Sequence, residues 1–440
     1  MPELKKTVGD YVTLQRGTTY KGVLVGKPGP ALLGLGSIEP GGGFREGHFK
    51  TYGGECPEKL VLYPGDLYVA LKGATKDGSM IGSVARVPNS VQSGRITQDT
   101  VKLQFADSCE DKKNYLYWVL RTPEYRNYCA EHATGTAMVA LSREDFLSYP
   151  VPPPTKTSLM LVSLFERIER KIELNCQMNR TLEEMVAALF KSWFVDFDPV
   201  HAKAAGRRPF GMDDETAVLF SDRFVESELG LIPEGWEYKT LGDVTSYLKR
   251  GLGPKYIEDG GIRVINQRCI RNSRVTLADA RRHDPGKRKI DGRILQKGDV
   301  LINSTGVGTL GRAAQLPDFL ERLVADSHVS VVRGDPTSIE SQYLAIALLT
   351  RQHELADLGE GSTGQTELGR KILAELPLIC PTLAVQRRFS EIVTPWRDLM
   401  FQNEIENGNL GDMRDTFLPK LFSGDIQINN QVERFSEEVV

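Results

Sequence analysis

Residues 295–304, LQKGDVLINS, repeat the pattern of residues 62–71, LYPGDLYVAL. Gly65-Asp66 precedes Gly298-Asp299 by 233 positions, and Gly9-Asp10 precedes Gly242-Asp243 by the same interval. Further matches lie 227 positions apart: Asp99 with Asp326, Leu141 with Leu368, Pro150 with Pro377 and Pro154 with Pro381. An ordered series of this kind indicates an internal repeat, with a six-residue slip between positions 66 and 99 where loops differ. We therefore expect two similar modules.

Each half ends in a proline-marked break followed by a long pattern with 4-3 spacing, which predicts two helices that pair as a coiled coil. The first seam is Leu161, Phe165, Ile168, Ile172, Asn175, Asn179, Leu182, Val186, Leu189 and Trp193. The second is Phe389, Ile392, Trp396, Leu399, Asn403, Glu406, Leu410, Met413 and Phe417. The alternative is an amphipathic helix on a globular core, but two matched seams in one chain supply partners for each other.

Particular residues refine the two predicted helices. Asn175 and Asn403 occupy equivalent seam positions, where a buried Asn fixes register at some cost in stability. Pro395 lacks a backbone donor and is expected to kink the second helix or delay its regular start. Residues 196–236 have the Pro, Gly and mixed charge of a surface linker. Outer-face residues Met178, Met185, Phe190 and Phe194 are apolar enough to need a covering partner.

The stretch LINSTGVGTLGRAA (301–314) contains a strand followed by Gly306, Gly308 and Gly311 in dinucleotide-binding spacing. A dinucleotide site also needs a helix that opens at the third glycine, and Pro317 leaves no room for one. The first half lacks these glycines. We expect instead a loop or hairpin that brings backbone amides, Ser304 and Thr305 to phosphate oxygens.

The sequence does not match the other motifs that would indicate catalysis, a metal site or a membrane-spanning segment. GVLVGKPG (22–29) departs from P-loop spacing, and no Asn/Asp-Pro-Pro-Tyr/Phe tetrapeptide of adenine methyltransferases occurs. The six cysteines show no metal or CxxC spacing, which is typical of reduced thiols, and no metal site is predicted. Without a signal peptide or an apolar run of membrane length, we expect a cytoplasmic protein with no membrane contact.

The net charge of -3 argues against a uniformly basic nucleic-acid binder, but residues 263–293 hold ten Lys and Arg against three Asp. The amide and guanidinium groups interleaved in this stretch are suited to hydrogen bonding with base edges in DNA. The alternative interpretation is a charged surface that contacts only solvent. The DNA-binding candidates of the second half are Arg250, Lys255, Tyr256, Asn266, Gln267, Arg268, Arg271, Arg274, Arg282, His283, Ser304 and Thr305. Those of the first half are Tyr20, Lys21, Arg45, Lys50, Lys72, Thr75 and Lys76.

The chain resembles the specificity subunit of type I restriction–modification enzymes over nearly its whole length. The resemblance rests on residues 172–207, GLIPEGWEYKTLGDV (230–244), VINQRCI (264–270), GDVLINSTGVGTLGR (298–312), GSTGQTEL (361–368) and LPKLFSGDI (418–426). The first-half loop TGTAMVALS (134–142) departs from the Gly-Ser-Thr-Gly-Gln form of its counterpart. The resemblance implies an α+β fold with two similar target recognition domains, separated by two long antiparallel helices that form a coiled coil, in a pseudo-two-fold repeat.

On this basis we expect target recognition domain 1 over 1–154, helical spacer 1 over 155–197, and a linker over 198–232. Target recognition domain 2 follows over 233–381, helical spacer 2 over 382–424, and a C-terminal tail over 425–440.

The resemblance also implies a function. Each recognition domain reads one half of a bipartite target in double-stranded DNA, and the helices set the gap and dock two methyltransferase subunits. Those subunits carry S-adenosylmethionine and methylate a flipped adenine, and motor-nuclease subunits join for restriction. The chain itself would hold no cofactor and catalyse nothing. Two alternatives stay open: a coiled-coil adaptor whose repeated modules bind protein, and an enzyme that uses the glycine-rich loop.

Overall fold

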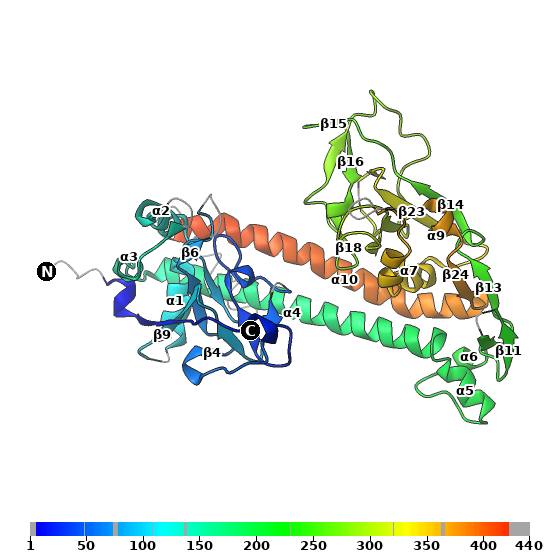
Figure 1. Ribbon diagram of the computed structural model, residues 1–440, viewed down its shortest axis with the longest axis horizontal. Helices are drawn as coiled ribbons and strands as arrows, with labels where there is room; N and C mark the ends of the chain where they lie inside the picture. Colours follow the sequence, from blue (N-terminus) through cyan, green and yellow to red (C-terminus); the bar gives the residue numbers. More distant parts are fainter. Residues whose placement is uncertain are drawn as a thin grey trace. The chain divides into compact units, whose positions relative to one another are not determined.

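The computed structural model describes two compact units, which share the two long helices (Figure 1). Unit 1 comprises Met1–Glu173 and Glu406–Val440, and unit 2 comprises Leu174–Ile405. Within these units, the described residues are 6–47, 49–73, 78–107, 109–135, 139–228, 230–319, 321–361 and 366–421. Among them, no helix combines the length and the apolar character that crossing a lipid bilayer requires.

Unit 1 contains two four-stranded sheets. The first is antiparallel, in the order β1 (Val12–Arg16), β9 (Thr100–Phe105), β5 (Leu67–Ala70) and β7 (Val84–Arg86). The second has the order β3 (Lys50–Thr51), β2 (Ala31–Leu33), β8 (Gly94–Ile96) and β4 (Val61–Leu62), with β2 and β8 parallel. Helices α1 (Glu110–Val119), α2 (Pro123–His132) and α3 (Arg143–Ser148) follow. All four residues of β5 are buried, so this strand lies at the centre of the unit 1 core.

Unit 2 repeats this arrangement. Its antiparallel sheet has the order β14 (Thr245–Arg250), β23 (Val329–Gly334), β20 (Val300–Asn303) and β21 (Ala313–Gln315). Its second sheet has the order β15 (Tyr256–Ile257), β19 (Arg281–His283), β16 (Ile262–Ile265) and β22 (Leu323–Ala325), with β16 and β22 parallel. Helices α7 (Ser341–Leu349), α8 (Gln352–Asp357) and α9 (Arg370–Ala374) follow, and α7 and α9 lie beside the first sheet (Figure 1). The predicted α+β fold with an internal repeat is confirmed.

The repeat extends to single backbone contacts. A Cβ atom on Gly17 would lie 1.8 Å from the carbonyl oxygen of Thr97, and one on Gly251 would lie 2.1 Å from that of Ala325. In both modules, therefore, only glycine lets the chain after the first strand pass this close to the neighbouring backbone. The matched positions of Pro150 and Pro377 are also equivalent in space, because Pro150 bridges Thr7 while Pro377 pairs with Thr240.

The predicted slip falls mainly in one hairpin. Leu67 pairs with Arg86, nineteen residues on, whereas Val300 pairs with Gln315, fifteen residues on. One predicted equivalence is wrong. Asp326 corresponds to Thr97 and not to Asp99, because Thr18 bridges Thr97 exactly where Leu252 bridges Asp326. Strand register fixes this correspondence. The offset between the modules has therefore fallen by only four of the predicted six residues at Thr97 and Asp326.

The two long helices, α4 (Lys156–Phe194) and α10 (Leu383–Phe417), run antiparallel within each unit. In unit 1, Lys171 pairs with Glu406 at 3.2 Å. In unit 2, the Nδ2 of Asn403 donates to the Oδ1 of Asn179 at 2.8 Å, and the Nδ2 of Asn179 donates to the carbonyl oxygen of Met400 at 3.1 Å. The buried asparagine predicted at 403 is therefore held by a specific partner, which fixes the helix register.

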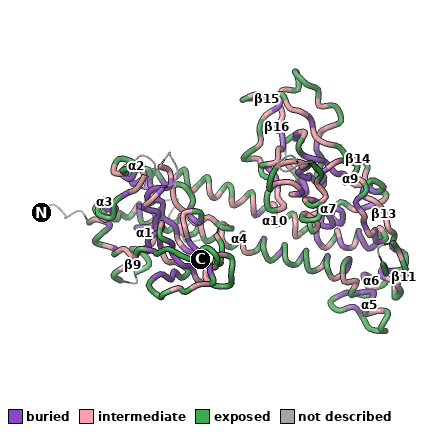
Figure 2. Tube along the Cα trace, viewed as in Figure 1, coloured by how far each residue is buried: buried purple, intermediate pink, exposed green. Residues whose placement is uncertain are grey.

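The seam predicted for α4 is largely confirmed. Its buried members are Leu161, Phe165, Ile168, Asn175, Asn179, Leu182, Val186 and Trp193. Figure 2 shows exposed residues interspersed with buried and intermediate ones along this helix. Met178 and Met185 are exposed as expected, but the placement of Phe190 and Phe194 on the outer face was wrong. Both rings are buried and pack against Phe389 of α10, because the aromatic core of unit 2 widens the buried face at this end of α4.

The seam predicted for α10 is confirmed in part: Phe389 and Asn403 are buried, and Ile392, Trp396, Leu410 and Phe417 pack against the two cores. Leu399 and Met413 are exposed, whereas Val385, Phe389 and Val393 are buried. These three follow a spacing of four, which shifts the buried face relative to a strict 4-3 pattern. The helix begins at Leu383, so Pro395 lies inside it and does not delay its start.

The linker contributes to a core as well as connecting the modules. It contains α5 (Asp198–Ala204), α6 (Asp214–Ala217) and the hairpin of β11 (Phe224–Ser227) and β12 (Gly230–Pro233). The side chain of Asp213 caps α6 and also pairs with Arg388 of α10 at 2.9 Å. Phe220 is buried against Trp193 of α4. The expectation of a purely surface segment was therefore wrong, because its apolar residues complete the unit 2 core.

Candidate nucleic-acid interface

The glycine-rich stretch of unit 2 forms the turn of a hairpin. Strand β20 pairs with β21 in antiparallel register, and Gly306, Gly308 and Gly311 all have positive φ. A Cβ atom on Gly311 would lie 2.5 Å from the backbone nitrogen of Ala356 in α8, so this glycine is needed for close packing. Because a strand and not a helix follows, the stretch cannot hold a dinucleotide in the usual way. The predicted hairpin is confirmed.

Side chains from three separate segments meet at this turn. Gln267, in the short 3-10 helix η5 (Gln267–Cys269), donates from Nε2 to the Oγ1 of Thr305 at 2.8 Å. Thr305 Oγ1 also lies 2.8 Å from the Nδ1 of His328, so its hydroxyl can donate to that nitrogen. Val307 at the tip is 82% exposed. The hydrogen bonds among Gln267, Thr305 and His328 therefore hold the base of the turn, while its tip is exposed to solvent.

Arg268 and Arg271 are the basic residues beside this turn that remain available. Both are exposed, and neither side chain has a hydrogen bond or ion pair within the described part of the chain. Other candidates are partly engaged: Arg250 pairs with Glu367 at 2.8 Å, and Arg282 donates to the carbonyl oxygen of Gly260 at 3.2 Å. The available positive charge in this part of unit 2 is thus concentrated next to Gln267 and Thr305.

Arg274 has a different role from the one predicted. Its guanidinium lies 2.5 Å from Glu183 of α4 and 2.9 Å from Glu404 of α10. Burial raises the pKa of Glu404, and the positive charge of Arg274 opposes that rise. These contacts join the recognition module of unit 2 to its own helices, so Arg274 is a positioning residue and not a free DNA contact.

Three further candidates are structural because they are buried or internally bonded. His283 is fully buried, and its Nδ1 accepts from the backbone N–H of Lys255 at 3.0 Å. Ser304 is also fully buried, with its hydroxyl 2.5 Å from that of Ser330. Asn266 accepts from the N–H of Arg268 at 2.8 Å, which caps η5. The sequence motif placed these residues near the site but could not show which way their side chains point.

The candidates of unit 1 are mostly exposed. Tyr20 is 41% exposed and packs its edge against Tyr52, while Lys21 and Lys50 are also exposed. Lys72 in β6 (Lys72–Gly73) is partly exposed, and Arg45 lies 3.5 Å from Glu39. Thr75 and Lys76 lie outside the described residues.

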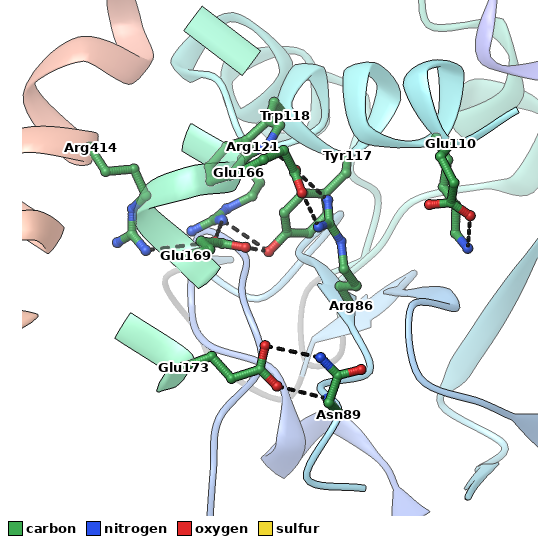
Figure 3. Close-up of polar contacts among 11 residues, drawn as sticks. Arg86, Asn89, Glu110, Tyr117, Trp118, Arg121, Glu166, Glu169, Glu173 and Arg414 are labelled. Atoms are coloured by element: carbon green, nitrogen blue, oxygen red, sulfur yellow. Dashed lines mark hydrogen bonds and ion pairs between the residues drawn. The ribbon is translucent and has the colours of Figure 1, made fainter. Parts of the chain in front are cut away.

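Sequence reasoning missed a charged cluster that joins α4 to the unit 1 module (Figure 3). Arg86 donates two hydrogen bonds to Glu166, at 2.6 and 2.7 Å, and the indole of Trp118 donates to the same carboxylate at 2.6 Å. Arg121 donates to Glu169 at 2.6 Å. Burial lowers the pKa of Arg86, but the hydrogen bonds to Glu166 and the interactions with Tyr117, Glu166 and Glu169 together raise it overall. The available signal was the acidic row on one face of α4, which also includes Glu173.

Two other useful residues were not among the candidates. His328 supports the glycine-rich turn, and its position next to the Gly-rich strand in space could not be read from the chain order. Arg281 stacks its guanidinium over the Tyr256 ring, 3.4 Å from the ring centroid. The signal for Arg281 was its place beside Arg282 in the basic stretch.

Comparison with known proteins agrees with this architecture. The family model of the type I restriction modification DNA specificity domain matches residues 233–409. The chain is 26% identical over 353 residues to the HindI specificity subunit of Haemophilus influenzae, covering 69% of this chain and 75% of the relative. It is 23% identical over 333 residues to the MjaIX specificity subunit of Methanocaldococcus jannaschii, covering 71% and 69%.

Among solved structures, the type I restriction–modification S subunit from M. genitalium aligns with a TM-score of 0.58. It is 16% identical, and the alignment covers 96% of each chain, so the fold is shared throughout. The chain is thus similar to the specificity subunits of type I restriction–modification systems, and its residues 233–409 match their DNA specificity domain.

Proposed function

We propose that this chain directs a type I restriction–modification complex to a bipartite target in double-stranded DNA. Each recognition module reads one half of the target, and the chain itself performs no chemistry. The observation that carries the proposal is the duplication of one α+β module, down to the close approach of Gly17 and Gly251, within one chain. Two copies of one scaffold with different loops suit two half-sites on a common duplex.

The helices support the idea that the gap between half-sites is set by the protein. Helix α4 has 39 residues and is therefore about 60 Å long, whereas one turn of B-DNA is about 34 Å. The two modules are attached near opposite ends of α4 in the chain order. We therefore expect two separated half-sites in place of one short continuous site.

The helix surfaces suit the docking of methyltransferase subunits. Leu159 and Leu164 of α4 are exposed in unit 1, and Leu174, Met178 and Met185 are exposed in unit 2. Large apolar side chains repeated along one exposed helix are typical of a surface that a partner covers. The partner subunits would supply S-adenosylmethionine and the adenine-methylating chemistry, and motor-nuclease subunits would supply cleavage.

Methylome sequencing tests the target directly. A host that expresses this chain with its methyltransferase subunits should gain methylated adenines in one motif made of two short specific parts and an unspecified gap. A continuous motif would contradict the two-reader proposal. A chain that binds its partners but leaves the methylome unchanged would instead favour a protein adaptor.

The gap can be altered by lengthening both helices together. Four residues are inserted in α4 between Lys171 and Asn179, and four in α10 between Asn403 and Glu406. Both pairs of partners, Lys171 with Glu406 and Asn179 with Asn403, then keep their register. One added turn of about 6 Å should lengthen the gap by one or two base pairs, because base pairs are about 3.4 Å apart. An unchanged gap in a folded variant would show that the helices do not set the spacing.

A further inference from the structure

The strand pairings of the two modules follow the same register, so residues of unit 1 and unit 2 can be matched one to one. Thr51 of β3 pairs with Ala31, and Arg282 of β19 pairs with Arg263 at the corresponding place in unit 2. Tyr52 and His283, the next residues along these strands, are therefore equivalent. Both are buried, at 4% and 0% exposure, although one is a phenol and the other an imidazole.

Each of these buried side chains holds a lysine backbone. The N–H of Lys21 donates to the hydroxyl oxygen of Tyr52 at 3.3 Å, and the N–H of Lys255 donates to the Nδ1 of His283 at 3.0 Å. Lys21 lies three residues after Thr18, and Lys255 lies three residues after Leu252, the equivalent bridge position. Both lysines are exposed. Two different side chains thus fix the backbone of an exposed lysine at the same point of the scaffold.

A second basic pair lies on the neighbouring strand. Lys50 is two residues before Tyr52, and Arg281 is two residues before His283, so each shares a strand face with the buried residue. Both are exposed. Arg281 is further ordered by stacking over Tyr256, the neighbour of Lys255 in sequence. Each module therefore carries two exposed cations in matching positions.

The residues around the glycine-rich turn, unlike the two cations, differ in chemistry between the two modules. The 3-10 helix η3 (Leu35–Ser37) follows β2 as η5 follows β16, so Gln267 and Arg268 correspond to Leu35 and Gly36. Their chemistry is not repeated. Two readers of different half-sites must differ where they contact bases, but both meet the same sugar-phosphate backbone.

We propose that Lys21 and Lys50 of unit 1, and Lys255 and Arg281 of unit 2, are phosphate contacts that place each module on the duplex. The inference rests on the proposed function in DNA recognition and assigns a sequence-independent task within it. The positive charges neutralise phosphates, while the unrepeated residues near η5 specify bases.

Two double variants of the full chain test this assignment: Lys21→Ala with Lys50→Ala, and Lys255→Ala with Arg281→Ala. Binding to random-sequence duplex is measured over a range of salt concentration, and preferred sequences are selected from a random duplex library. Each double variant should lower the slope of log affinity against log salt by about 1.8, that is about 0.9 per lost phosphate contact. The selected sequences should be those of the wild type.

Two exposed lysines without a basic counterpart serve as matched controls. Lys59→Ala in unit 1 and Lys371→Ala in unit 2, combined in one double variant, also remove two charges and should leave the salt slope unchanged. Lys255→Arg should retain it. Equal thermal midpoints for all variants establish that they fold.

The outcomes separate the two proposals. An unchanged slope in folded double variants overturns the phosphate assignment, and so does a change in the selected bases, while DNA recognition by the chain stands. If the wild-type chain shows no salt-dependent binding to duplex, the proposed function fails and the assignment falls with it.

Discussion

The two recognition modules have the same sheets in the same order, yet they differ in what holds each to the helices. In unit 1, Arg86 and Arg121 reach half-buried carboxylates of α4, with Trp118 sharing one of them. In unit 2, Arg274 reaches carboxylates of both α4 and α10 in a more exposed position. The scaffold of a duplicated module is therefore constrained by backbone geometry, whereas its attachment and its loops are free to differ.

The strongest test of the shared scaffold is a methyl group at its closest backbone contact. Gly17→Ala places a Cβ atom 1.8 Å from the Thr97 carbonyl oxygen, so we expect a loss of about 3 kcal/mol or more in unfolding free energy. Gly22→Ala is the matched control, because a Cβ there meets nothing within 4 Å, and its effect should stay within about 0.5 kcal/mol. Denaturant unfolding of the full chain measures both. Similar small effects at the two sites would refute the constraint.

The difference in attachment predicts unequal costs for removing an acidic partner. Glu166→Ala leaves Arg86 and the Trp118 indole without their acceptor in a site where both charged side chains are at most a quarter exposed. We expect a loss of about 3 kcal/mol. Glu183→Ala removes a partner of Arg274 at a site that is 38% and 50% exposed, and Glu404 remains beside it. That loss should be below about 1 kcal/mol, as measured by thermal unfolding, and equal losses would contradict the contrast.

The loops should differ in specificity more than in stability. Arg268→Ala removes an exposed guanidinium whose equivalent in unit 1 is Gly36, and no scaffold contact is lost. We expect altered preference at one or two base pairs of one half-site, by about 1–3 kcal/mol, with no change in the other half. Sequence selection from a duplex library measures this. Arg312→Ala is a suitable comparison, because that side chain is committed to the carbonyl oxygen of Gly308. A loss that is uniform across sequences would reassign Arg268 to the DNA backbone.

Much of the architecture could be predicted because it depends on local spacing. The Gly-Asp matches predict the duplicated sheets, and the 4-3 pattern of α4 identifies most of its buried residues. The same pattern is only partly correct in α10, where Phe389 and Asn403 are buried but Leu399 and Met413 are exposed. Apolar residues lie on several faces of that helix, so burial is decided by the partner surface and not by the residues of the helix alone.

The candidate site was harder to predict than the fold. Basic residues in one stretch of chain separate in space: Arg268 is exposed, Arg274 joins the helices, and His283 is buried. Periodicity says nothing about such partners, because each depends on segments distant in sequence. The cluster around Glu166 was missed for the same reason, since Arg86 lies 80 residues away from it along the chain.

Unit 1 is built from two segments that lie at opposite ends of the chain, which affects the order in which it can fold during synthesis. Its core includes Phe165 and Ile168 of α4 together with Leu418 and Leu421, which follow α10. During synthesis these last residues emerge only after the whole of unit 2 has been translated. The first module to leave the ribosome is thus the last to obtain its complete core, and a chain interrupted before α10 ends would expose the apolar surface that marks it for degradation.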